Sequence, residues 1–247
     1  MFRNLFANVR AKSPLVHNIT NYVTVNDCAN IVLACGASPI MADDAAEVED
    51  ITSLCAGLNL NIGTLNSRTI PSMLLAGHTA NRLGRPVVLD PVGAGASHLR
   101  TETALRLLRE VKFTVIRGNI SEIRTLAAGS GTTKGVDADT ADKVTDETLD
   151  KTVAFAKAFA ARTGAVVAVT GTGCQLSALT AAFCAANPDK PLEAAAAAVC
   201  AMGLAGEAAH SRLSRLDGNA TYRNYIIDAI FNMTPEQLEE GACYEMR

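Results

Sequence analysis

Residues 165–186 read AVVAVTGTGCQLSALTAAFCAA, and this stretch decides the fold. An apolar, β-branched run ends in Gly171 and Gly173, and a helix-forming run follows immediately. Strand, glycine turn and helix in this order leave free backbone N–H groups at the helix start, where they and the helix dipole favour an anion such as a phosphate. Cys174 falls in the first helical turn, where we expect its thiol to lose its proton more easily than in water. The structural alternative is a tight turn with Cys174 as a small buried apolar residue.

Length, composition and charge limit the classes of function. The 247 residues suffice for one large α/β domain, and 49% of them are hydrophobic. A net charge of −3 argues against nucleic acid and acidic membrane surfaces as partners. The seven cysteines form no CxxC pair, which fits free thiols in a reducing cytoplasm better than disulfides or a zinc site.

No membrane-targeting segment is expected. The first fourteen residues, MFRNLFANVRAKSP, lack the apolar core of a secretory signal. The alanine-rich run 192–204 is too short and too interrupted to span a bilayer. We therefore expect a cytoplasmic protein with no membrane partner.

Strand and helix patterns alternate along the chain, which predicts an α/β fold. The predicted strands are apolar throughout, as in a mostly parallel central sheet with helices on both faces. Strands are expected at 15–18, 37–41, 58–63, 86–90, 113–117 and 165–170. Helices are expected at 2–12, 25–35, from 43, 70–83, 101–110, from 121, 145–163, 175–186, 191–215 and 221–232. Residues 129–146, rich in Gly, Thr and Asp, read as a loop, and the simplest organisation is a single domain over 1–247.

A cluster of polar side chains follows the first predicted strand. Amide, hydroxyl and imidazole groups crowd ten residues, at His17, Asn18, Thr20, Asn21 and Asn26. Such groups can orient a small polar ligand, or they can cap the next helix.

Polar or glycine-rich residues end four of the predicted strands, at 41–43, 90–95, 117–119 and 170–174. Ligands of open parallel sheets bind beyond the carboxyl ends of the strands, so these groups should meet at one edge. Asp90 and Glu122 can hold Mg²⁺ through water, and Arg117 and Thr170 can bind phosphate. Taken singly, each has a structural alternative as a cap, as support for a helix dipole or as an ion pair. Their convergence favours a phosphoryl-transfer site.

Six motifs run in one order over most of the chain: PLVHNITNYV (14–23), GASPIMA (36–42), LNIGTL (60–65), VVLDPVGAG (87–95), VIRGNISEI (115–123) and VTGTGCQLSA (169–178). With them the chain resembles hydroxyethylthiazole kinases, which have the ribokinase-like fold and serve thiamine salvage. The resemblance implies ATP-dependent phosphorylation of the hydroxyl of 4-methyl-5-(2-hydroxyethyl)thiazole. The alternatives are a catalytically impaired thiazole-binding homologue and a kinase of another small alcohol, such as hydroxymethylpyrimidine.

The resemblance also implies roles for single residues, all matched by motif. Cys174 takes the position of the catalytic base, where many ribokinase-like relatives carry Asp. The remaining roles are thiazole binding by Met41, Gly171, Asn21 and Val23, ATP contact by Arg117 and Thr170, and a place near Mg²⁺ for Asp90 and Glu122. The family forms homotrimers with active sites at subunit interfaces, where residues near Asn21–Val23 come from the neighbouring subunit.

The chain departs from the family pattern in one place. Family members carry a longer segment, enough for a β-hairpin, between the strand that ends in VTG and the VTGTGC turn. Here the chain reads VAVTGTGC with nothing between. Thr170 and Gly171 therefore match two family positions at once, the ATP-contacting threonine and the first glycine of the turn. We expect either weakened ATP binding or a loss of kinase activity.

Overall fold

The centre of the structure is a six-stranded sheet in the order β2-β1-β3-β4-β5-β6. The structure is a computed structural model that describes residues 1–129, 145–171 and 173–245, so most of the loop expected at 129–146, and Thr172, lie outside the described residues. Every pair of neighbouring strands is parallel, which confirms the expected parallel sheet. The strands are β1 (Leu15–Ile19), β2 (Ser38–Ile40), β3 (Gly57–Asn61), β4 (Val87–Asp90), β5 (Val115–Gly118) and β6 (Val166–Val169).

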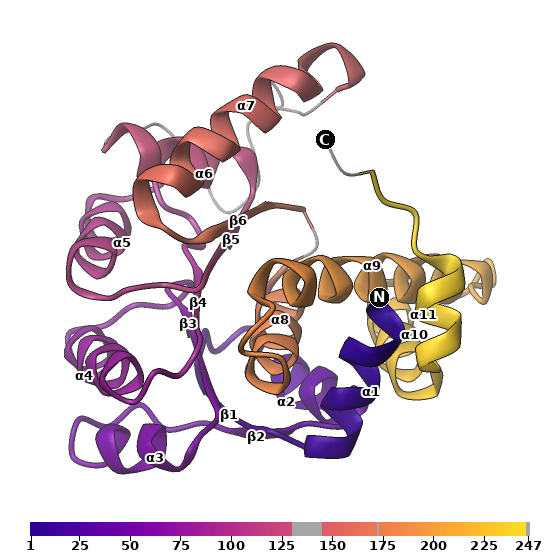
Figure 1. Ribbon diagram of the computed structural model, residues 1–247, viewed down its shortest axis with the longest axis horizontal. Helices are drawn as coiled ribbons and strands as arrows, with labels where there is room; N and C mark the ends of the chain where they lie inside the picture. The colour runs from indigo at the N-terminus through magenta and orange to yellow at the C-terminus, as the bar shows by residue number, and fades with distance from the viewer. Residues whose placement is uncertain (130–144, 172, 246–247) are drawn as a thin grey trace.

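Helices cover both faces of the sheet (Figure 1). One layer is formed by α3 (Val48–Leu54), α4 (Thr69–Arg82), α5 (His98–Glu110), α6 (Ile120–Ala128) and α7 (Asp146–Thr163). The other face carries α1 (Phe2–Lys12), α2 (Val25–Ala34), α8 (Cys174–Ala186), α9 (Pro191–Ser211), α10 (Asn219–Asn232) and α11 (Pro235–Gly241). The sheet is therefore the middle of three layers.

The strands are apolar throughout because each of their sides faces a helix layer. In β4, Val88 joins the core that contains α1, α2 and α8, whereas Leu89 joins the core that contains α4 and α5. Their partners in β5 follow the same alternation, since Val88 pairs with Val115 and Leu89 with Ile116. Successive side chains of a strand point to opposite faces, so burial of both faces requires a continuous apolar run.

Several helix ends differ from the predictions, and local hydrogen bonds explain two of them. Helix α5 begins at His98 rather than near 101, because Ser97 Oγ accepts the backbone N–H of Arg100 at 3.3 Å. Helix α11 was not predicted, although Thr234 and Gln237 form a capping box at its start. The spacing of Thr234 and Gln237 is visible in the sequence and would have revealed this helix.

Helix α9 is longer than the run considered in the sequence. It has 21 residues and an apolar window with a mean hydropathy of 1.4, so by length and composition alone it is sufficient to cross a membrane. The run 192–204, which was expected to be too short for this, is only a part of the helix. Helix α9 packs against α8 and α10, and 44% of its apolar window is buried inside the protein.

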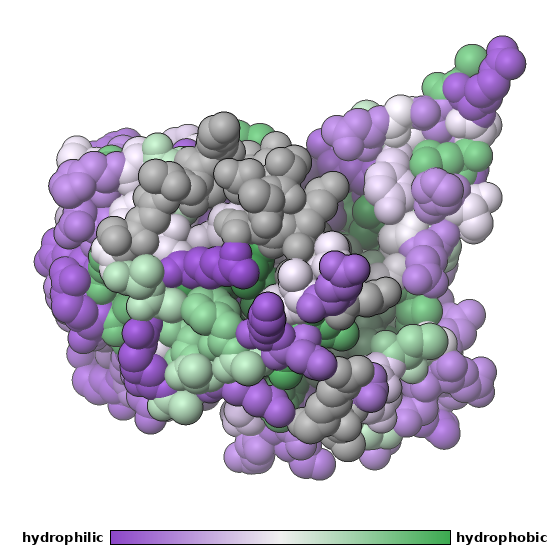
Figure 2. Space-filling view, turned by 90° about the horizontal axis from the view of Figure 1, so that it is seen from above, coloured by the Kyte–Doolittle hydropathy of each residue, from purple (hydrophilic) through white to green (hydrophobic). Residues whose placement is uncertain are grey.

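Strand β6 forms one edge of the sheet, with β5 on one side only. All four of its residues are half-buried, whereas the four residues of β5 are buried. A groove of about 940 Å³ runs beside β6, lined mainly by apolar side chains of α7 and β6, with Leu192 of α9. Figure 2 looks onto this end of the molecule, where hydrophobic surface lies in a hollow between its two halves. The edge of β6 is thus open next to an apolar groove.

Candidate active site

The carboxyl ends of the parallel strands meet at a cavity of about 370 Å³. Eight of the nine residues to which the resemblance assigns a role line it: Asn21, Val23, Asp90, Arg117, Glu122, Thr170, Gly171 and Cys174. The other lining residues are Thr24, Gly63, Val92, Asn119 and Gly173. The predicted convergence of polar strand ends is confirmed for 90–95, 117–119 and 170–174, but the strand end at 41–43 does not line the cavity. The cavity is the candidate active site.

Met41 does not line this cavity. Its side chain follows β2 and packs, half-buried, against the core that contains α1, α2 and α8. Strand β2 is the sheet edge opposite β6, which puts Met41 apart from the centre of the site. Asn21 and Val23, by contrast, reach the cavity of their own chain, so their presence there does not require a neighbouring subunit.

The glycine turn between β6 and α8 is open to the cavity. Gly173 precedes the helix with a φ of +72°, in the left-handed region that favours glycine. A Cβ added at Gly171 or Gly173 would meet no heavy atom within 4 Å, so space remains above the backbone. No side-chain hydrogen bond caps α8 among the described residues. The N–H groups of its first turn are placed to receive an anion.

The thiol of Cys174 is held by amide and hydroxyl groups. Asn21 Nδ2 donates to Cys174 Sγ at 3.0 Å. Burial raises the pKa of Cys174 above its ordinary value, the charge of Asp90 adds to the rise, and hydrogen bonds from Thr24, Asn61 and Asn21 oppose it. The expectation that this thiol loses its proton more easily than in water was therefore wrong. Removal of the thiolate from water raises the pKa by more than the hydrogen bonds lower it.

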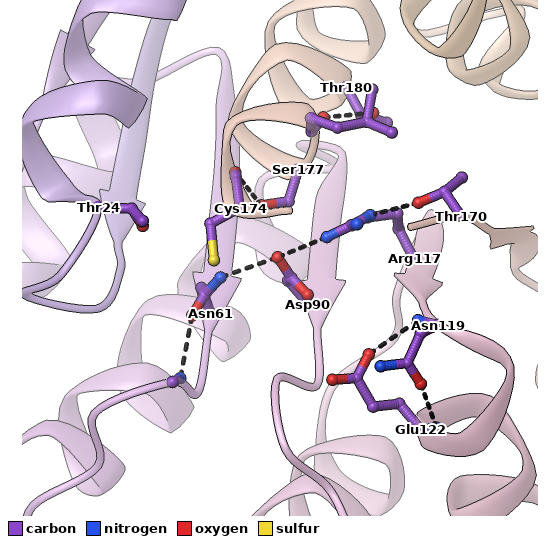
Figure 3. A network of polar contacts seen from close by, with 12 residues as sticks. Thr24, Asn61, Asp90, Arg117, Asn119, Glu122, Thr170, Cys174, Ser177 and Thr180 are labelled. Atoms are coloured by element: carbon purple, nitrogen blue, oxygen red, sulfur yellow. Dashed lines mark hydrogen bonds and ion pairs between the residues drawn. The ribbon is translucent and has the colours of Figure 1, made fainter. Parts of the chain in front are cut away.

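Arg117, Asp90 and Thr170 form a connected group on the opposite side of the cavity (Figure 3). Arg117 Nη1 pairs with Asp90 Oδ2 at 3.0 Å, and Arg117 Nε donates to Thr170 Oγ1 at 2.8 Å. The N–H of Thr170 donates to the carbonyl of Gly118 at 2.9 Å and so continues the ladder between β5 and β6. Thr170 therefore lies at the end of β6 and next to Arg117, which is the position that the expected phosphate contact requires.

Glu122 has a structural function as well as its predicted place in the site. Its Oε2 accepts the N–H of Asn119, and Asn119 Oδ1 accepts the N–H of Glu122, which forms a capping box at the start of α6. Its Oε1 accepts the N–H of Gly93 at 2.8 Å and so ties the loop after β4 to α6. Burial raises the pKa of Glu122 to about 7, the charge of Asp90 adds to this, and the N–H donors oppose it.

Asp90 and Glu122 fit a divalent cation that is held partly through water. The Oδ1 atom of Asp90 is buried and has no hydrogen-bond partner among the described residues. Mg²⁺ usually keeps several waters and takes only one or two carboxylates from the protein. The described residues contain no group of three or more His, Cys, Asp or Glu side chains suited to direct coordination.

The polar residues that follow and end β1 fall into two groups, one that bonds within the core and one that reaches the cavity. His17 is fully buried in β1, where its ring nitrogens contact Thr52 Oγ1 at 2.9 Å and the carbonyl of Ala42 at 2.8 Å. Asn18 bonds within the sheet, to the carbonyl of Val16 and to Asn59. His17 and Asn18 therefore do not cap α2, the structural alternative for this cluster, but bond within the core, whereas Asn21 reaches the cavity.

Asn61 also belongs to the site, although it was not predicted from the sequence. It ends β3 and is 1% exposed, and its Nδ2 donates to Asp90 Oδ2 at 2.8 Å. A polar residue at the end of an apolar strand is the same signal that identified Asp90. That signal was present at Asn61 within the motif LNIGTL.

The sequence profile of the Hydroxyethylthiazole kinase family matches residues 6–172 and 165–236. A hydroxyethylthiazole kinase of Clostridium acetobutylicum is 60% identical over 271 residues, with 99% of each chain covered. One of Ruminiclostridium cellulolyticum is 48% identical and covers 96% of this chain and 94% of its own. The solved structure of hydroxyethylthiazole kinase from Pyrococcus horikoshii OT3 has a TM-score of 0.85 at 31% identity, with 98% and 97% of the two chains covered.

A more distant structure shows the fold alone. The pyridoxal kinase of Staphylococcus aureus has a TM-score of 0.54 at 14% identity, over 83% of this chain and 90% of its own. The layered parallel sheet and these neighbours confirm the ribokinase-like fold.

The same comparisons locate a shortened connection after β6. The family profile matches residues 165–172 twice, once as the end of its first segment and once as the start of its second. The alignment with the Clostridium acetobutylicum protein spans 271 positions, although this chain has only 247 residues. The relative therefore has at least 24 residues without a counterpart here, and the double match indicates the end of β6 as their place.

Proposed function

This chain belongs to the hydroxyethylthiazole kinase family, and from that membership we propose that it transfers the γ-phosphoryl group of ATP to the hydroxyl of 4-methyl-5-(2-hydroxyethyl)thiazole in thiamine salvage. The observation that carries the proposal is the meeting of Cys174, Arg117 and Asp90 in one cavity at the start of α8. A thiol, a guanidinium and a carboxylate around a helix N-terminus suit phosphoryl transfer, because this reaction depends mainly on positioning and on neutralisation of charge.

The acceptor hydroxyl and the phosphates would enter from different sides of the cavity. On the acceptor side, Asn21, Val23 and Gly171 line the cavity together with Cys174, and Asn21 bonds to its thiol. On the nucleotide side, Arg117 and Thr170 would contact the phosphates. The two sides meet above Gly173, where the backbone leaves space for the transferred group.

Cys174 would accept the proton of the thiazole hydroxyl as phosphoryl transfer proceeds. Its raised pKa means that the thiol is mostly protonated at neutral pH, so only the small thiolate fraction can accept the hydroxyl proton and general-base catalysis contributes little. The transition state of phosphoryl transfer is loose, so the hydroxyl need not be deprotonated early. We therefore assign most of the rate to the first turn of α8 and to Arg117.

Asp90 and Glu122 would hold Mg²⁺ through water. When bound, the cation neutralises charge on the phosphates. Arg117 already balances Asp90, so the orphaned Oδ1 of Asp90 is the oxygen left for this contact.

Assembly as a homotrimer in the cytoplasm is part of the proposal. Tyr22 and Val23 are 59% and 83% exposed, and Val23 lines the cavity mouth. Exposed apolar side chains beside a site support its cover by a neighbouring subunit, and a ring of heterologous contacts would supply one. Met41, which its own chain does not bring to the cavity, would reach a thiazole only from such a neighbour. All seven cysteines are free, as expected in a reducing compartment.

The deciding experiment is incubation of the purified 247-residue chain with ATP, Mg²⁺ and hydroxyethylthiazole, followed by the mass of the product. We expect a gain of one phosphoryl group on the thiazole and none on hydroxymethylpyrimidine, the control acceptor. A folded protein that binds the thiazole without turnover would overturn the proposal and make the chain an impaired homologue.

A further inference from the structure

The side chain of Asn61 is bonded at both ends. Its Nδ2 donates to Asp90 Oδ2 at 2.8 Å (Figure 3). Its Oδ1 accepts from Asn21 Nδ2 at 3.1 Å and from the N–H of Gly63 at 2.9 Å. An ionised carboxylate only accepts and a backbone N–H only donates. Asn61 therefore has a single amide orientation, which Asp90 and Gly63 set from opposite ends.

Asn21 connects the oriented amide of Asn61 to the thiol of Cys174. Its Nδ2 donates to Asn61 Oδ1 and to Cys174 Sγ, at 3.1 and 3.0 Å. Its Oδ1 accepts the N–H and the hydroxyl of Thr24, at 3.0 and 3.1 Å. Rotation of the Asn21 amide would break four contacts, so the N–H remains directed at the sulfur as long as Asn61 presents its oxygen.

The backbone of Gly63 approaches both asparagine side chains closely. A Cβ at this position would lie 2.9 Å from the Cβ of Asn21 and 3.0 Å from Oδ1 of Asn61. Both amides are also shielded from water, since Asn21 is 3% and Asn61 1% exposed. The chain of contacts from Asp90 through Asn61 and Asn21 to Cys174 is therefore continuous and closely packed.

We propose that Asn61 is a positioning residue that couples the carboxylate of Asp90, on the nucleotide side of the cavity, to the thiol of Cys174, on the acceptor side. This rests on the proposed function. Asn61 does not line the cavity and would touch no substrate; it acts through its contacts with Asp90, Asn21 and Cys174. The acceptor hydroxyl and the phosphate are aligned only when the residues on the nucleotide side and on the acceptor side of the cavity keep fixed relative positions. The chain of contacts from Asp90 to Cys174 connects these two sides.

Asn59 provides a matched control. It lies two residues earlier in β3 and hence on the same face of the strand, and it is fully buried. Its Nδ2 also donates to an asparagine, Asn18 Oδ1, at 3.1 Å, but that contact leads away from the cavity. A purely structural role for Asn61 predicts equal effects of Asn61→Ala and Asn59→Ala.

The test compares these two variants in turnover and in thiol chemistry. For Asn61→Ala we expect kcat to fall about 10- to 100-fold, with KM for ATP changed less than about threefold. We also expect slower alkylation of Cys174 by iodoacetamide at fixed pH, because weaker N–H donation disfavours the thiolate. Peptide mass spectrometry measures this rate against exposed Cys243 in the same sample. Asn59→Ala should leave both quantities close to wild type.

Two further variants keep the test decisive if Asn61→Ala does not fold. Asn21→Asp retains an acceptor for Thr24 and removes both N–H donors, and Asn21→Ala removes the donors without adding charge. Both should slow the alkylation of Cys174. Equal alkylation and equal kcat in the Asn61 and Asn59 variants, or unchanged alkylation in both Asn21 variants, would overturn the assignment. Alkylation needs no substrate, so inactivity of the wild type toward the thiazole would refute the proposed function and leave this comparison valid.

Discussion

The carboxylate of Asp90 and the guanidinium of Arg117 form an ion pair with 3.0 Å between Oδ2 and Nη1, and only 1% and 5% of their side chains are exposed. The two residues end or nearly end neighbouring strands, β4 and β5, so sheet pairing brings them together. A buried pair of this kind is balanced only while both charges are present.

Asp90→Asn should destabilise the fold as well as the proposed cation site. The variant keeps the size of the side chain but leaves Arg117 buried without a counter-charge, which costs about 3–5 kcal/mol in comparable pairs. Urea unfolding measures this loss. Glu110→Gln breaks the exposed pair with Arg106 and should cost less than about 1 kcal/mol. An equal decrease in the free energy of unfolding in the two variants would contradict the larger contribution of the buried pair to stability.

Cys174→Ala should slow phosphorylation of the thiazole rather than abolish it. General-base catalysis typically contributes about 10²- to 10⁴-fold, and the raised pKa of Cys174 favours the lower end of that range. Steady-state kinetics on the variant, with circular dichroism and ATP binding as checks of the fold, give the answer. Cys243→Ala, at an exposed cysteine, should remain as active as wild type. A folded, ATP-binding but inert Cys174→Ala would show that the thiol is essential.

The stability of the protein should decrease on acidification through His17. Burial lowers the pKa of His17 below 6.5, so below that pH the unfolded chain takes up a proton that the folded chain does not. The free energy of unfolding should therefore fall between pH 7 and 5, by at most about 1.4 kcal/mol per pH unit from this residue. His17→Gln should flatten this dependence in urea unfolding, and His78→Gln, at an exposed site on α4, should not. If the free energy of unfolding falls equally with decreasing pH in wild type and in His17→Gln, His17 is excluded as the cause of the pH dependence.

Insertion of the longer segment that the Clostridium acetobutylicum relative carries after β6 should stabilise the β6 edge of the sheet. In this variant, the corresponding longer stretch of the Clostridium acetobutylicum relative replaces residues 165–172. We expect the added residues to cover the open edge of β6, to raise Tm by about 3 °C for each kcal/mol gained and to lower KM for ATP. A glycine-serine segment of equal length is the control and should lower Tm. A Tm no higher than that of the glycine-serine control would refute cover of β6 by the added residues.

The sequence by itself determined the layers and the place of the site. Continuous apolar runs separated by helical patterns require a parallel sheet that is buried on both faces, and parallel strands end at one edge. The polar residues Asp90, Arg117 and Thr170 therefore had to meet there. Glycines before a helix likewise fix an anion-binding turn locally, because backbone N–H groups at a helix start need partners.

Only the tertiary structure decided which side chains of the site are in contact and in which direction the pKa of Cys174 is shifted. Asn21 and Cys174 are 153 positions apart, and no local pattern predicts that one donates to the other. Burial reversed the expected pKa of Cys174 because desolvation depends on everything packed around the thiol, including α2 and the charge of Asp90. The role of Asn61 arises in the same way, since a hydrogen-bonded chain exists only once its members are brought together in the folded protein.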